Sequence, residues 1–212
     1  MTADLEGIAF KTCSVCDEIT RAVVGFLSTY QYELITSSSA RENLAKLGGF
    51  CSMHTWQYDV LAGARGTCVA MSVVLSRFAE RIRETARDES TLAHGRLGKL
   101  SLVGEDCPAC EVMRDAEQCL IAAASNVEHD DVSVFCLGHF ARVIDELPND
   151  AMVLRFAESQ AHAVARVAND MQRFVVKFDS LRRDLLEPEE RSADRRGLSM
   201  LAGSRGKNGI VG

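Results

Sequence analysis

The sequence predicts an all-α protein with two related helical units, each holding a metal site of three cysteines and one histidine, and a long C-terminal helix. Only three prolines occur in 212 residues, and there is little sustained alternation of apolar and polar residues that would indicate strands. Four ligand-type pairs, each with two intervening residues, also occur in the same order in the two halves. Helices with repeated metal motifs therefore account for most of the chain.

In the first half, the expected helices start and stop at recognisable signals. Ser39 can cap a short helix that Gly48-Gly49 ends. Gly63 and Gly66 break the chain ahead of a longer helix. The expected helices are residues 17–30, 39–47, 54–61 and a longer one that reaches about residue 89. The longer helix carries an apolar stripe at Met71, Leu75, Phe78 and Ile82.

The second half repeats this order after a glycine-containing linker. A helix is expected from Cys107-Pro108 to about Ser125, and another over residues 136–147. The C-x-x-C pairs are 94 residues apart and the C-x-x-H pairs 85 apart, so the second copy has nine fewer residues between its ligand pairs. The predicted organisation is a first metal-binding unit at 8–89, a linker at 90–105, a second unit at 106–186 and a C-terminal tail at 187–212.

The strongest helical periodicity lies between residues 150 and 185. Its seam alternates steps of three and four residues: Leu154, Ala157, Ala161, Val164, Ala168, Met171, Val175 and Phe178. Packing within the protein's own bundle is the favoured interpretation, and a homodimer seam is the alternative. We expect a protein partner through this helix and the tail, whose glycine-rich residues 203–212 are typical of a segment ordered only against a partner.

Eight residues are the candidate metal ligands. Three sulfurs and one imidazole are the donor set of a tetrahedral zinc site, and two intervening residues let a pair point at one ion from a tight turn or the first turn of a helix. The pattern uses six of eight cysteines and two of five histidines, so coincidence is a poor explanation. The candidates are Cys13, Cys16, Cys51, His54, Cys107, Cys110, Cys136 and His139.

The sequence identifies the candidate ligands more clearly than it shows which ligand pairs share one metal ion. The simplest arrangement joins pairs that are adjacent in sequence, with Cys13, Cys16, Cys51 and His54 at one ion and the other four donors at a second. A cross-brace that joins pairs from different halves stays open. Either arrangement leaves each site with a formal charge of minus one, which amides or basic residues must balance.

The order of the motifs resembles that of a bacterial family known as a domain of unknown function. The resemblance rests on C-x-x-C, Gly49-Phe50-Cys51-x-x-His54, Cys107-Pro108-x-Cys110, a second C-x-x-H and a tail with Arg195-Arg196-Gly197-Leu198, and it spans residues 10 to about 203. It implies that the eight cysteines and histidines bind metal, and it implies no reaction. Ser14 stands where the family has proline, and Val134-Phe135 replaces the Gly-Phe lead.

Zinc is the favoured metal, as two structural ions, because the donor set matches structural zinc sites. Iron–sulfur clusters are the main alternative, although the bunched cysteine run of bacterial ferredoxins is missing. Asp17 and Glu111 stand where covalent haem attachment needs histidine. A thioredoxin-like redox pair is disfavoured because no βαβ pattern surrounds either C-x-x-C.

Composition limits the classes of function. The net charge of −6 argues against a nucleic-acid surface, no run reaches the roughly 18 apolar residues of a membrane helix, and no secretory signal opens the chain. A cytoplasmic location is expected. A closed metal shell cannot act as a Lewis acid, so the expectation leans against an enzyme. It favours a structural or interaction subunit acting as an adaptor or accessory protein, with a redox subunit or a metal-delivery protein as alternatives.

Other candidate residues receive simpler interpretations. Cys68 and Cys119 lie among apolar residues and are expected to be buried. Trp56, two residues after His54, is expected to pack over the first metal site. Four acidic residues are expected on solvent-facing helix surfaces: Asp115, Glu117, Asp145 and Glu146.

Overall fold

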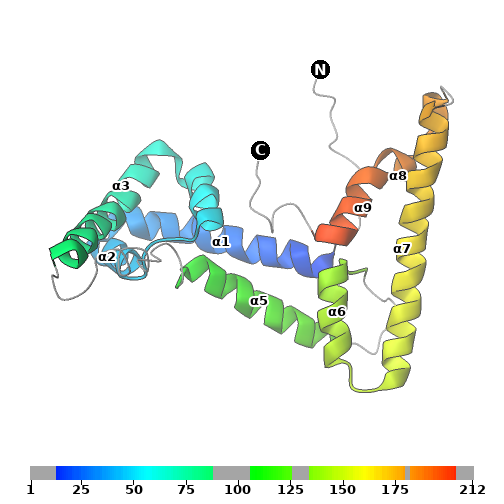
Figure 1. Cartoon of the computed structure of the whole chain (residues 1–212), viewed down its shortest axis with the longest axis horizontal. Coiled ribbons are helices and arrows are strands. Elements are labelled where there is room, and N and C mark those ends of the chain that lie inside the picture. Colours follow the sequence, from blue (N-terminus) through cyan, green and yellow to red (C-terminus); the bar gives the residue numbers. More distant parts are fainter. Residues whose placement is uncertain (1–12, 88–105, 126–133, 180–181, 204–212) are drawn as a thin grey trace. The chain divides into compact units, whose positions relative to one another are not determined.

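The computed structural model describes residues 13–87, 106–125, 134–179 and 182–203, and every regular element in them is helical (Figure 1). The predicted all-α class is thus confirmed. The elements are α1 (Ser14–Thr36), α2 (Ser38–Lys46), α3 (Ser52–Arg87), α5 (Pro108–Ser125), α6 (Leu137–Glu146), α7 (Asp150–Asp179), the 3-10 helix η1 (Arg183–Leu185), α8 (Pro188–Arg191) and α9 (Ala193–Ala202). The predicted linker, residues 90–105, lies outside the described residues.

The chain divides into two compact units, and each draws on both halves of the sequence. Unit 1 contains the start of α1 up to Ile19 and the chain from Glu117 onward, and unit 2 contains Thr20 to Ala116. Helices α1 and α5 therefore contribute to both units. This division differs from the predicted one, in which each unit was a continuous half of the chain.

The core of unit 2 is built around Phe50, which is 1% exposed and directly precedes the ligand Cys51. The Phe50 ring lies 5.3 Å from the ring of Tyr58 and 6.2 Å from that of Tyr30, measured between centroids. Leu44 of α2 is fully buried as well. Because aromatic side chains bury large apolar areas, this cluster fixes the chain next to the ligand pair at the start of α3.

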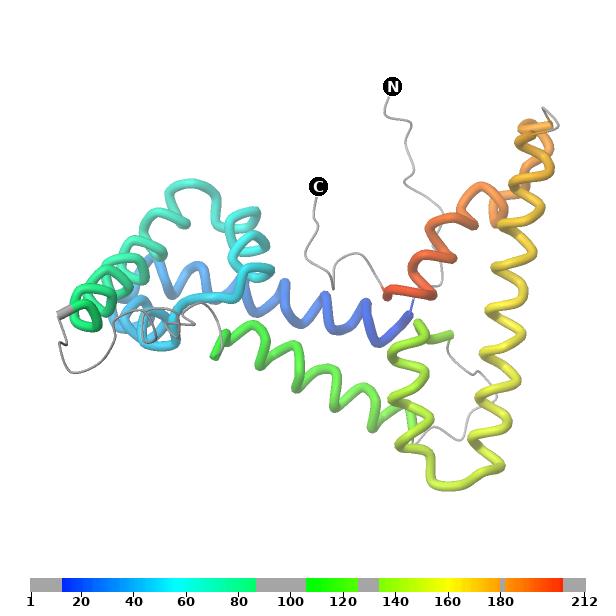
Figure 2. The backbone as a smooth tube through the Cα atoms, in the orientation of Figure 1, coloured from blue at the N-terminus to red at the C-terminus, as the bar shows by residue number. Residues whose placement is uncertain are grey.

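Helix α3 is kinked at Gly63, as the sequence predicts. Gly63 has φ 62° and ψ 176°, a backbone conformation that strains residues with a Cβ. The Tyr58 hydroxyl donates to the Gly66 carbonyl over 3.5 Å, and Thr67 Oγ1 donates to Asp59 Oδ1 over 3.0 Å, so side chains bridge the kink. Figure 2 shows the change of direction of the α3 backbone at this kink.

The inward face of the second arm of α3 differs from the predicted stripe. Ala70 and Val74 are buried, whereas Leu75 is 65% exposed and Ile82 is 46% exposed. Helix α2 packs against α3, and a short helix covers only the row of side chains that meets it. The periodicity correctly predicted an amphipathic helix here, but the buried side chains belong to the row next to the predicted stripe.

One described helix, α3 over Ser52–Ala86, is long and apolar enough to cross a membrane by length and composition. A single helix of this kind is weak evidence for a membrane span, and 17% of its apolar window is buried in the described structure. The expected cytoplasmic location stays a prediction.

In unit 1, α7 turns a different face inward from the predicted seam. Its buried residues are Phe156, Gln160, Ala163 and Val167. Leu154 is 71% exposed and Val175 is 54% exposed. The favoured prediction, that this seam packs within the protein's own helical bundle, is therefore wrong. Two apolar rows lie side by side on this helix, and the row with the aromatic Phe156 faces the core.

The described part of the predicted tail folds against α7. Helices α8 and α9 both pack on α7, and α9 also meets α6. Arg196 forms an ion pair with Asp170 over 2.9 Å, and Lys177 forms one with Glu190 over 2.6 Å. Lys177 holds the pKa of the Glu190 carboxyl below its usual range. The segment up to residue 203 is therefore part of unit 1.

Candidate metal centres

All four ligand pairs occupy the same local structure, the beginning of a helix. The first ligand of each pair directly precedes the helix and the second is its third residue. The backbone carbonyl of each first ligand accepts a hydrogen bond from the backbone amide four residues later. The donors are Asp17 at 3.1 Å, Thr55 at 2.9 Å, Glu111 at 3.2 Å and Phe140 at 2.8 Å. The predicted placement of the pairs at helix first turns is confirmed.

This placement suits thiolate ligands electrostatically. A helix N-terminus carries unpaired amides and the positive end of the helix dipole, equivalent to about half a charge. Two such termini converge on each cluster of donors. With a divalent ion bound to three thiolates, they would offset part of the net negative charge. None of the described lysines and arginines is buried.

The pairs combine across the two halves of the sequence. Site 1 consists of Cys13, Cys16, Cys136 and His139, and site 2 consists of Cys51, His54, Cys107 and Cys110. Each site lies within one unit, site 1 in unit 1 and site 2 in unit 2. All eight predicted ligands are brought together, but the expected pairing of motifs adjacent in sequence is wrong.

Helix length explains the crossed pairing. Helix α1 has 23 residues and is about 35 Å long, so it carries the chain far from its own C-x-x-C pair. The nine-residue α2 is only about 14 Å long and does not return the chain over that distance. The C-x-x-H pair at the start of α3 therefore meets another helix start, that of α5.

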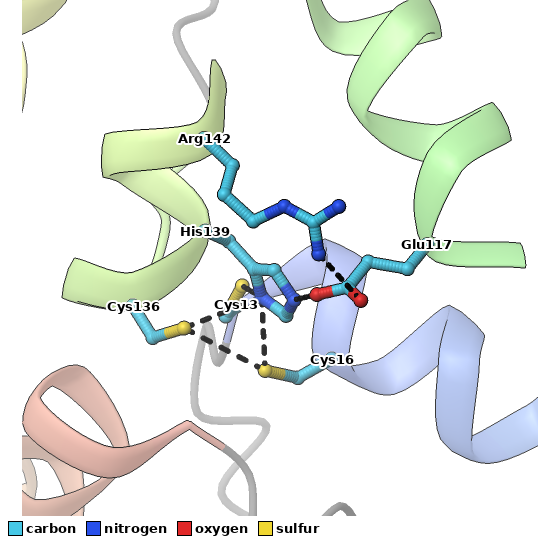
Figure 3. A network of polar contacts seen from close by, with 6 residues as sticks. All are labelled: Cys13, Cys16, Glu117, Cys136, His139 and Arg142. Carbon is cyan, nitrogen blue, oxygen red and sulfur yellow. Dashed lines mark hydrogen bonds and ion pairs between the residues drawn. The ribbon is translucent and has the colours of Figure 1, made fainter. Parts of the chain in front are cut away.

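Site 1 is a buried cluster centred on the His139 ring (Figure 3). The Nδ1 atom lies 3.3 Å from each of the Sγ atoms of Cys13, Cys16 and Cys136, and the Cys16 and Cys136 sulfurs are 3.7 Å apart. All four residues are buried. The ring presents Nδ1 to the sulfurs, which leaves Nε2 for a second interaction.

Glu117 of α5 provides that second interaction. Its Oε1 is 2.8 Å from His139 Nε2, and its Oε2 accepts from Arg142 Nη1 over 2.6 Å (Figure 3). A carboxylate on the distal nitrogen fixes the tautomer and orientation of a metal-binding histidine and raises its basicity. The expectation that Glu117 faces solvent is wrong, since the residue is 9% exposed. Its position seven residues after Cys110, on the same helix face, was the available signal.

Gln160 of α7 fixes the chain just before Cys136. Its side-chain amide donates to the Phe135 carbonyl over 2.7 Å and accepts from the Phe135 amide over 3.2 Å. Gln160 is 4% exposed, so both bonds are shielded from water. This pair of bonds ties α7 to the ligand segment of site 1.

Site 2 has the same donors but a more open surface. His54 Nδ1 lies 3.2 Å from Cys51 Sγ, 3.4 Å from Cys107 Sγ and 3.3 Å from Cys110 Sγ. The Cys51 and Cys110 sulfurs are 3.6 Å apart. His54 and Cys107 are buried, whereas Cys51 and Cys110 are partly exposed.

The protonation equilibria at both sites follow burial and sulfur contacts. Burial lowers the pKa of His54, which favours the neutral imidazole that binds metal. Burial, with nearby thiols, raises the pKa of Cys110 to about 12. Hydrogen bonds from Cys13 and Cys16 lower the pKa of Cys136. A bound cation stabilises all the thiolates together, so metal binding displaces protons.

Three sequence expectations outside the sites are wrong. Cys68 and Cys119 are both exposed, not buried, because each lies on the outward face of an amphipathic helix. Trp56 is 68% exposed and covers neither site. Asp115, Asp145 and Glu146 are exposed, as predicted for solvent-facing positions.

Comparisons with known proteins add no assignment. A scan against protein-family models, a search of curated proteins and a search of solved structures each found no match to this chain. The resemblance of the motif order to a bacterial family stays a prediction. Function is therefore argued from the two clusters, whose composition and geometry are compatible with metal binding.

The crossed pairing predicts the metal content of double variants. Replacing Cys13 by serine and His139 by alanine removes two ligands from site 1 alone, so we expect the C13S/H139A protein to keep one metal ion per chain. Replacing Cys13 and His54 together damages both sites, so C13S/H54A should keep none. Elemental analysis of desalted protein measures both contents. The opposite pattern, with C13S/H54A keeping the single ion, would establish pairing within the halves.

Glu117 is predicted to support site 1 without touching its metal. Glu117→Gln removes the negative charge from the His139 partner, and loss of such a partner typically lowers metal affinity about 10–100-fold. Competition with a chromogenic chelator, read for each site separately in variants that lack the other site, measures this effect. Asp115→Asn, on the exposed face of the same helix, is the matched control. Equal affinities of the E117Q and D115N proteins would contradict the role assigned to Glu117.

Proposed function

We propose that this chain is a non-catalytic protein with two structural zinc ions, which acts as an adaptor or accessory subunit. The observation that carries the proposal is the gathering of donors from remote segments. In each site four ligand atoms lie within 4.8 Å of one another. Such clustering of six cysteines without a disulfide is expected of metal ligands.

The spacing of the donors supports a single ion over a cluster. A tetrahedral zinc ion with bonds of about 2.3 Å to sulfur and about 2.0–2.1 Å to nitrogen sets its ligand atoms about 3.6–3.8 Å apart. The two sulfur–sulfur separations, 3.6 and 3.7 Å, fall in this range, and the sulfur–nitrogen separations in site 2 are shorter, at 3.2–3.4 Å. All four donor atoms of each site lie within 4.8 Å of one another. A multi-iron cluster holds its cysteines around several metal and sulfide atoms, which requires wider spacing.

The proposed role of the metal is to hold helix beginnings together. Each site joins two helix N-termini that come from different halves of the sequence. Structural zinc supplies an apparent binding free energy of about 10–16 kcal/mol, and this becomes folding free energy when the unfolded chain has no preformed site. A chain with long helices and limited cores gains most from such links.

The closed donor set supports a non-catalytic role for the metal. Catalytic zinc keeps a position for water or substrate, usually beside three protein ligands. Each site here offers four protein donors of the types that fill a tetrahedral shell. The metal then has no vacant position for Lewis-acid chemistry.

The partner of the proposed subunit is a protein that contacts α7 and α9. Several exposed apolar side chains lie on these two helices, which pack together in unit 1. They include Leu154 at 71%, Val176 at 67%, Leu198 at 64% and Leu201 at 67% exposure. Exposed apolar side chains on two helices that pack together are typical of an interaction surface.

Zinc content and stability are predicted to change together. Protein purified without added metal should contain two zinc ions per chain, and removal of both by a strong chelator should lower the helical signal and the melting temperature because the helix starts are released. Elemental analysis and circular dichroism on the same samples test this. Iron with acid-labile sulfide would overturn the zinc assignment. An unchanged melting curve after complete metal loss would overturn the structural role.

The α7–α9 surface is predicted to bury its leucines on association. Leu198→Arg with Leu201→Arg places two charges on α9 and should abolish self-association if the partner is a second copy. Sedimentation equilibrium measures this, with Leu75→Arg, which is equally exposed on α3, as the control. A monomeric wild-type protein directs the search to a different protein, captured by the wild type and not by the double variant. Identical behaviour of all three proteins would contradict the assignment of this surface.

A further inference from the structure

The ligands of the two metal sites differ in their exposure to solvent. All four ligands of site 1 are buried, whereas two of the four in site 2, Cys51 and Cys110, are partly exposed. Small oxidants reach a thiolate only through such exposure, and the thiolate form is the reactive one. The chemistry of the two clusters is therefore unequal although their donors are the same.

The two sites also differ in the residues that can orient the ligand histidine. His139 is oriented by Glu117, which lies seven residues after Cys110 on α5. The corresponding position on α1, seven residues after Cys16, is Val23, which is buried and apolar. At this corresponding helix position α1 therefore carries an apolar side chain and α5 a carboxylate. Loss of such a partner weakens metal retention.

We propose that the Cys51 and Cys110 thiolates of site 2 are a peroxide-reactive pair whose oxidation to a disulfide releases the zinc ion, while site 1 keeps its ion. This inference rests on the proposed zinc-binding function and assigns a regulatory reaction to one of its two sites. The oxidant is a hydroperoxide, the class of reagent small enough to reach a partly exposed sulfur.

The reaction has two balanced steps. One of the two thiolates attacks the peroxide, so that a sulfur–oxygen bond forms, the oxygen–oxygen bond breaks and hydroxide leaves, giving a sulfenic acid after protonation. The second thiolate attacks this sulfur and displaces hydroxide, forming the sulfur–sulfur bond. The two sulfurs lose two electrons, the peroxide gains two, and protons from solvent convert the hydroxides to water.

Proximity and exposure select this pair. The Cys51 and Cys110 sulfurs are 3.6 Å apart and come from the starts of α3 and α5. The Cys16 and Cys136 sulfurs are almost as close, at 3.7 Å, but both residues are buried. Exposure therefore decides which pair reacts. After oxidation only Cys107 and His54 remain as donors, and two ligands do not close a tetrahedral shell.

The experiment treats the zinc-loaded full chain with hydrogen peroxide in a C68S/C119S background, which removes the two exposed cysteines outside the sites. A chromogenic chelator follows zinc release, and peptide mapping identifies the disulfide. We expect one zinc ion per chain to leave rapidly with a Cys51–Cys110 disulfide. Site 1 should lose its ion at least about ten-fold more slowly, since all four of its ligands are buried and its supporting carboxylate strengthens metal retention. Reductant with added zinc should restore the second ion.

The outcomes separate this inference from the proposed function. Protein that carries no zinc before peroxide is added overturns the proposed function, and this inference with it. Two zinc ions that leave at the same rate, a disulfide between Cys16 and Cys136, or retention of both ions under peroxide overturns the inference alone. Adding Glu117→Gln should narrow the difference in release rate between the sites, and an unchanged ratio would contradict the role given to the carboxylate.

Discussion

The meeting of two helix beginnings at each cluster of donors is the constraint on which the other features depend. One ligand pair supplies only two donors, whereas two pairs complete a four-donor set. The pairs lie on helix first turns, where free amides and helix dipoles favour thiolates. Closure of a site therefore aligns two helices as well as four side chains, and the cores of the two units are assembled around these joints.

Crossed pairing gives α1 and α5 an unusual role. Each helix begins at one metal site and continues in the unit that holds the other site. A change at Cys13 therefore acts on the beginning of a helix whose later residues, such as Leu27 and Leu34, are fully buried in unit 2. We expect loss of either ion to affect both units through these shared helices.

The two sites have the same donor set of three cysteines and one histidine, but their surroundings differ. Around site 1, Glu117 holds the histidine and Gln160 holds the chain before Cys136. Next to site 2, Phe50 anchors the ligand segment by apolar packing, while two sulfurs stay partly exposed. Site 1 is thus enclosed by polar and buried contacts, whereas two of the donors of site 2 remain accessible to solvent.

The sequence by itself predicted the helical class and the eight candidate ligands, and it left open a tight turn or a first helical turn for each ligand pair. These features could be predicted because they depend on local spacing along the chain. The sequence also located the kink at Gly63. Only the tertiary structure decided the pairing of Cys13 with His139, because helix lengths govern which helix starts meet. Burial of Glu117 and of Phe156 in place of the predicted seam was likewise decided there. Periodicity shows that a helix has an apolar side, but packing against neighbouring helices determines which row of side chains is buried.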